Sequence, residues 1–98
     1  MVVEVLGRGQ ISFANVEYED FREALSMMEN NPEAFTISDY DEVNYIIYFE
    51  MGGNKGIDYQ PLDEIRKYLL EKNARFQMSV VEYVEGETGF FFETEQEE

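Results

Sequence analysis

Residues 35–50, near the middle of the chain, read FTISDYDEVNYIIYFE. Phe35 and Ile37 alternate with polar residues, and Ile47 and Phe49 alternate in the same way after a polar stretch. A period of two is typical of strands that bury one face, and a short polar stretch between two such runs indicates a hairpin. The middle of the chain therefore predicts antiparallel sheet.

Apolar residues at helical spacing flank this hairpin on both sides. From Glu17 to Asn30 they recur every three or four positions, and Asn31-Pro32 ends the pattern. After the hairpin, Pro61 suits the first position of a second helix. The inward positions are Phe21, Ala24, Leu25 and Met28 in the first segment and Leu62, Ile65 and Leu69 in the second.

Each end of the chain predicts one more hairpin, because two apolar runs flank a glycine-containing turn. Towards the amino terminus, the turn is Gly7-Arg8-Gly9, between strands at Val2–Leu6 and Gln10–Phe13. Towards the carboxyl terminus, the strands are Phe76–Val84 and Phe90–Glu93.

These elements predict an α+β fold in which two helices pack on one face of an antiparallel sheet. Sliding the chain by about 41 positions aligns the apolar patterns of its two halves, which is consistent with repeated βαββ units. Any two helix–hairpin units share such a pattern, so duplication and coincidence both stay open. We expect a single acidic domain over residues 1–93 and a frayed acidic tail over residues 94–98.

The charge of the chain is strongly one-sided, since 22 Asp and Glu face 7 Lys and Arg and give a formal net charge of −15. This charge repels nucleic acids and anionic membranes, so we expect neither as a direct partner. There is no Cys and no His, which removes thiol chemistry, the usual zinc ligands and the commonest general base. We expect a cytoplasmic protein that is not an enzyme and has no cofactor.

One carboxylate pattern resembles a calcium loop. Asp39, Asp41 and Glu50 occupy three of its positions, but Val43 and Asn44 stand where the loop needs a ligand and a glycine. We therefore expect no metal site. A small enzyme or cation binder that uses the Asp39–Asp41 turn is the least favoured interpretation.

The outward faces of the two predicted helices differ in charge. The second alternates acids and bases at helical spacing, which is typical of a solvated face. The first carries like charges about 5–6 Å apart, with Arg22 as its only base, and stability alone would not favour this pattern. Further carboxylates lie in the turn of the central hairpin. The predicted partner-binding residues are Glu19, Asp20, Glu23, Asp39, Asp41 and Glu42.

Residues Glu33–Asp41, with the sequence EAFTISDYD, resemble the aromatic-x-Ile-x-Asp-Tyr-acidic stretch of ArdA-type antirestriction proteins, which are acidic DNA mimics of mobile elements. The size, the charge and the lack of catalytic residues are similar to anti-CRISPR inhibitors and to small nuclease-immunity proteins. The charge and this resemblance imply a stoichiometric inhibitor whose carboxylates occupy the basic nucleic-acid channel of a CRISPR effector or restriction nuclease.

Another class of protein fits the same sequence. In an acidic interaction or structural module, or in a nuclease-immunity protein without DNA mimicry, the charge would mainly keep the chain soluble. Exposed aromatic residues such as Tyr40, Tyr48 and Tyr83 would then form an ordinary interface, or a homodimer through edge-strand pairing.

Overall fold

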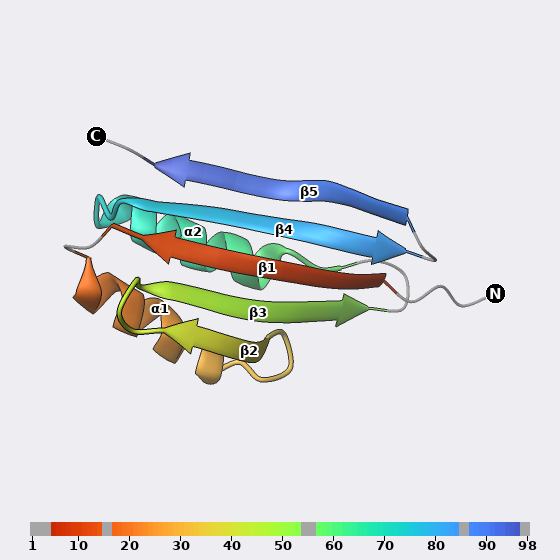
Figure 1. The fold of residues 1–98 in the computed structure, drawn as a ribbon, viewed down its shortest axis with the longest axis horizontal. Coiled ribbons are helices and arrows are strands. Elements are labelled where there is room, and N and C mark those ends of the chain that lie inside the picture. The colour runs from red at the N-terminus through yellow and green to blue at the C-terminus, as the bar shows by residue number, and fades with distance from the viewer. Residues whose placement is uncertain (1–4, 15–16, 54–56, 85–86, 97–98) are drawn as a thin grey trace.

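The computed structural model of the chain describes residues 5–14, 17–53, 57–84 and 87–96. Both helices lie on the same face of one antiparallel sheet, so the fold is of the α+β class, as the sequence predicts (Figure 1). The elements in chain order are β1 (Val5–Phe13), α1 (Tyr18–Glu29), β2 (Thr36–Asp41), β3 (Ile46–Gly53), α2 (Gln60–Glu71), β4 (Phe76–Val84) and β5 (Glu87–Gln96).

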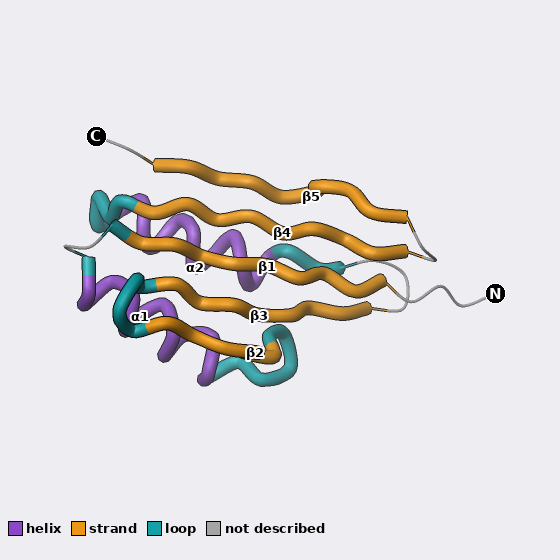
Figure 2. Tube along the Cα trace, viewed as in Figure 1, coloured by secondary structure: helices purple, strands orange, loops and turns teal. Residues whose placement is uncertain are grey.

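The first described strand lies at the centre of the sheet. The strand order is β2-β3-β1-β4-β5, so one hairpin is added to each side of β1 (Figure 2). In the first hairpin the second strand is the inner one, whereas in the second hairpin the first strand is the inner one. Two complete βαββ units would also need one strand more than the described residues form. Repeated βαββ units are therefore not confirmed.

β1 corrects the prediction of a hairpin near the amino terminus. Gly7 and Gly9 lie inside one continuous strand, where Gly9 pairs with Phe49 of β3. A Cβ atom on Gly9 would lie 2.4 Å from Cζ of Phe49, and one on Gly7 would lie 2.7 Å from Cδ1 of Ile57. The two glycines make room for large neighbouring side chains, so the predicted turn is wrong. Residues 2–4 of the expected first strand lie outside the described residues.

The core lies between the sheet and the two helices. The ring of Phe21 on α1 is fully buried and packs edge-on against Phe13 of β1, with centroids 6.2 Å apart. Phe35 and Phe49 form a second edge-to-face pair at 5.7 Å. Such pairs add to the free energy gained by apolar burial. The inward helix positions are all buried, as predicted: Phe21, Ala24, Leu25, Met28, Leu62, Ile65 and Leu69.

The carboxyl-terminal hairpin is longer than predicted. β4 has the predicted bounds, but β5 runs to Gln96, through the start of the segment expected to fray. Backbone pairing explains the extension, since Thr94 lies opposite Met78 and Gln96 lies opposite Phe76. The first residues of β4 therefore hold the last residues of β5.

The surface outside the core carries two of the aromatic residues expected to be exposed. Tyr40 of β2 and Tyr48 of β3 are both exposed, and the side chain of Tyr83 lies outside the described part of the structure. Among the described residues, neither helix is long and apolar enough to cross a membrane.

Candidate functional site

The amino-terminal half of α1 and the turn between β2 and β3 meet at one end of the molecule (Figure 1). The rings of Tyr18 and Phe21 lie 5.6 and 5.7 Å from the ring of Tyr45, which ends the turn. Arg22 of α1 also pairs with Glu42 of the turn, with Nη1 and Oε1 3.6 Å apart. This packing places the end of β2 and the turn after it beside the amino-terminal half of α1, so both predicted groups of acids lie at this end of the molecule. We call the six predicted residues the acidic end: Glu19, Asp20, Glu23, Asp39, Asp41 and Glu42.

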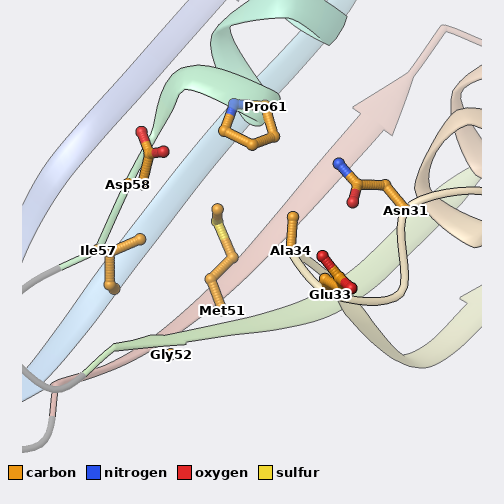
Figure 3. Close-up of a pocket in the computed structure, with 8 residues that line it drawn as sticks. All are labelled: Asn31, Glu33, Ala34, Met51, Gly52, Ile57, Asp58 and Pro61. Atoms are coloured by element: carbon orange, nitrogen blue, oxygen red, sulfur yellow. The ribbon is translucent and has the colours of Figure 1, made fainter.

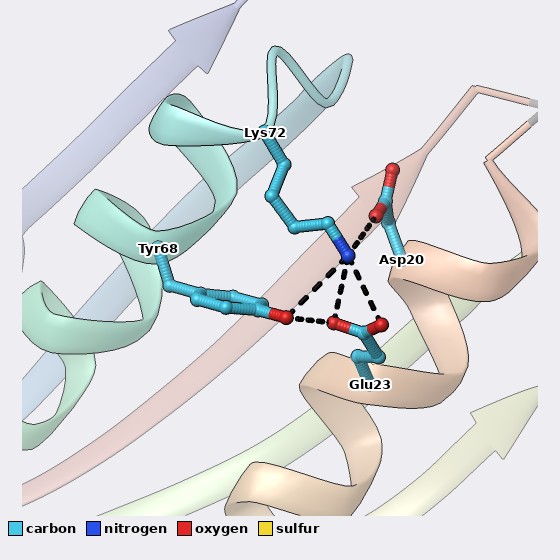
Figure 4. Close-up of polar contacts among 4 residues, drawn as sticks. All are labelled: Asp20, Glu23, Tyr68 and Lys72. Atoms are coloured by element: carbon cyan, nitrogen blue, oxygen red, sulfur yellow. Dashed lines mark hydrogen bonds and ion pairs between the residues drawn. The ribbon is translucent and has the colours of Figure 1, made fainter.

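Asp20 and Glu23 face the carboxyl-terminal end of α2 (Figure 4). Lys72 Nζ lies 2.9 Å from Oε2 of Glu23 and 3.6 Å from Oδ1 of Asp20. The Tyr68 hydroxyl donates a hydrogen bond to Glu23. This bond and the Lys72 ammonium lower the pKa of Glu23, and the Glu23 carboxylate in turn raises the pKa of Lys72. We call Asp20, Glu23, Tyr68 and Lys72 the helix–helix cluster.

The helix–helix cluster corrects the interpretation that the acids of α1 have only Arg22 as a base. Lys72 stands 49 positions after Glu23 in the sequence and follows the last residue of α2. Helical spacing shows which residues share a face of one helix, but it does not show what a neighbouring helix places there. Part of the acidic surface of α1 is therefore compensated inside the fold.

Asp41 is engaged by its own turn. Its carboxylate accepts hydrogen bonds from the side-chain amide of Asn44 at 2.8 Å and from the N–H groups of Asn44 at 3.0 Å and Val43 at 2.8 Å. These bonds lower the pKa of Asp41. Asp39 accepts a bond of 2.8 Å from the N–H of Tyr40. Asp41 therefore shapes the turn, in the way that aspartate often does, whereas Asp39 bonds within β2.

The acidic end keeps an excess of negative charge. Glu19 is exposed and forms no ion pair with any other described residue. Glu42 is 52 % exposed even though it pairs with Arg22. Arg75 Nε lies 3.3 Å from Oε1 of Glu17, and the carboxyl of the nearby Asp20 raises the pKa of Glu17. Arg22, Lys72 and Arg75 are thus already paired, and carboxylates still outnumber them.

The three carboxylates of the calcium-like pattern have separate roles. Glu50 lies on the sheet and pairs with Arg8 at 3.2 Å, Asp39 bonds to the N–H of Tyr40 within β2, and Asp41 bonds to the turn. Within the described ranges, no three carboxylates are placed so that they could hold a metal ion.

A pocket of about 270 Å³ lies at the other ends of the two helices, where the loop after α1, the end of β3 and the segment before α2 meet (Figure 3). Glu33 and Asp58 are its carboxylates, and Asp58 accepts a hydrogen bond of 3.0 Å from the N–H of Gln60. No residue of the acidic end lines this pocket, and no sequence motif pointed to it. Its lining residues are Asn31, Glu33, Ala34, Met51, Gly52, Ile57, Asp58 and Pro61.

Comparison of the chain with protein-family models, with curated proteins and with solved structures finds no match. The segment that resembles ArdA-type proteins forms β2 and the loop before it, at one edge of the sheet. That resemblance stays a prediction.

Proposed function

We propose that the protein is a stoichiometric inhibitor that acts in the host cytoplasm on a nucleic-acid-binding defence protein, either a CRISPR effector or a restriction nuclease. The acidic end would occupy the basic surface on which this target holds nucleic acid. One observation carries the proposal: two distant segments of the chain bring their acids together, although every described Lys and Arg side chain is already paired. The remaining negative charge has no base left among the described residues.

The chemistry of the acidic end suits a surface that binds phosphate. Carboxylates and phosphates both accept paired hydrogen bonds from arginine, and complementary charge speeds the encounter of two proteins. Glu19 and Glu42 are exposed and would lead the contact. Tyr18 is 46 % exposed and Val43 is 82 % exposed beside them, so apolar contacts that DNA does not offer would add affinity.

The proposal is tested by titrating the protein into cleavage reactions of purified CRISPR effectors and restriction nucleases. We expect inhibition of at least one enzyme that saturates at a fixed molar ratio and weakens as salt rises. Loading the enzyme with its DNA beforehand should delay inhibition, because both ligands need the same surface. The proposal fails if no enzyme of the panel is inhibited, or if DNA and inhibitor bind together.

The acidic end is tested by the double variant Glu19→Lys with Glu42→Lys. We expect inhibition to weaken about tenfold or more, because attraction becomes repulsion at the interface. The matched control is Glu64→Lys with Glu71→Lys on α2, which changes the net charge equally at two exposed positions. Equal losses in both variants would mean that only overall charge matters. Asp20 and Glu23 are left unchanged, since a lysine there would face Lys72.

The second candidate is an acidic interaction module or an immunity protein that blocks a nuclease without mimicking DNA. The helix–helix cluster favours it, because Asp20 and Glu23 already have partners inside the fold, and so does Asp41. These acids can therefore serve stability alone. A target that is inhibited while it still binds DNA would identify this candidate.

A further inference from the structure

The two outer strands of the sheet differ in length, although the pairing of each contains one register shift. β2 has six residues, and its register with β3 shifts between Ile37 and Asp39. β5 has ten residues and pairs with β4, and among the described residues no strand lies beyond it. Its register shifts once, and after that shift the stretch Phe92–Gln96 pairs residue by residue with β4. Short, bulged edges resist further pairing, whereas longer regular edges are open to it.

The β5 edge is also one-sided in charge. No Lys or Arg follows Arg75 in the sequence. Glu93 and Glu95 take alternate positions in the regular stretch, opposite Ser79 and Gln77 of β4, and alternate residues of a strand belong to the same face of the sheet. Like charges across a strand pair are unfavourable and opposite charges are favourable. This edge therefore disfavours a second copy of itself and favours a basic strand.

We propose that β5 is a docking edge for an extended basic segment of a partner protein, with Lys or Arg at alternate positions of that segment, paired in register with Glu93 and Glu95. The segment would add to the sheet as one more strand beside β5. Main-chain hydrogen bonds would supply affinity, and the alternating charges would fix the register. The proposal does not depend on the inhibitor function, because the acidic end is built from α1, β2 and the β2–β3 turn. β2 is the outer strand at the opposite edge of the sheet from β5.

The first test uses a synthetic ten-residue peptide of alternating lysine and threonine, followed by fluorescence anisotropy at low salt. We expect saturable binding of the unmodified peptide. One derivative is N-methylated on the backbone at its lysines and another at its threonines. Because alternate residues of a strand point their N–H groups to the same edge, each derivative loses the N–H donors of one edge only. One derivative should bind about tenfold or more weakly, and the other should bind like the unmodified peptide. Equal behaviour of the two derivatives, or no saturable binding, would overturn the proposal.

The second test locates the site at which the peptide binds. Glu93→Lys with Glu95→Lys should weaken binding about tenfold or more, whereas the charge-matched control Glu64→Lys with Glu71→Lys should change it by less than about threefold. Backbone N–H exchange in residues 92–96 should slow when the peptide binds. Slowing confined to α1 would place the peptide at the acidic end instead and would overturn the proposal. If the Glu93 and Glu95 variant does not fold, backbone N–H exchange in the unmodified protein still tests whether the peptide binds at β5.

Discussion

α1 and α2 have the same length and bury the same kind of apolar face, yet they balance their charges differently. α2 pairs charges within itself, since Asp63 lies 2.6 Å from Arg66 and 3.2 Å from Lys67. Acids of α1 pair instead with Lys72, the residue that follows the end of α2. The two helices run in opposite directions, so the amino-terminal end of α1 lies beside the carboxyl-terminal end of α2 (Figure 1). The charge pattern on one helix can therefore be interpreted only together with the charged residues that neighbouring elements place beside it.

The first prediction asks whether apolar packing holds both helices despite their different charges. Phe21→Ala on α1 should lower the free energy of unfolding by about 3–5 kcal/mol, and Leu69→Ala on α2 should lower it by about 2–5 kcal/mol. Both side chains are fully buried, so each change leaves a cavity. Urea unfolding measures both values. A loss of less than about 1 kcal/mol for Phe21→Ala would mean that α1 is held mainly by its charges.

The second prediction reverses the charge of Lys72, the base that pairs with the acids of α1. Lys72→Glu should lower Tm clearly, because a third carboxylate would face Asp20 and Glu23. Lys67→Glu is the control, since it changes the net charge equally while Asp63 keeps Arg66 as a partner. Thermal unfolding followed by circular dichroism compares the two. Equal shifts would show that the position of Lys72 has no special role.

The third and smallest effect concerns the pH dependence of the helix–helix cluster. The pKa of Glu23 lies below its ordinary value of 4.5, chiefly because Tyr68 donates a hydrogen bond to the carboxylate. A lowered pKa stabilises the fold above the ordinary value, and this contribution is lost as pH falls through the lowered value. Tyr68→Phe should therefore lower Tm near pH 7, and the difference from the unchanged protein should vanish at acidic pH. Tyr48→Phe, at an exposed position on β3, should show no such pH dependence.

The sequence predicts the helices and their buried faces well, because Phe21 and Leu69 follow a helical period that little else would produce. It fails at Gly7 and Gly9, since glycine marks both a turn and a place where a large side chain must pass. Only the pairing of Gly9 with Phe49 distinguishes the two. That pairing joins residues far apart in the chain, and no local pattern contains it.

The sequence predicts the exposure of some residues of the acidic end but not the contacts of the others. Glu19 is exposed, as its position on the helix predicts. Glu23 has the same type of side chain one turn later, but it faces Tyr68 and Lys72. The difference depends on how α2 is placed over the sheet, which helical spacing cannot show.

The central place of β1 affects how the chain folds. β1 precedes every other described strand, and its two neighbours, β3 and β4, both follow it after long intervening segments. While the chain is being synthesised, β1 must therefore stay incompletely paired until β4 has emerged. Pairing between distant segments raises contact order and slows folding, because the loops must close before the contacts that reward closure can form. The sheet is therefore completed late, and each hairpin joins it only by pairing with β1, which is synthesised before both.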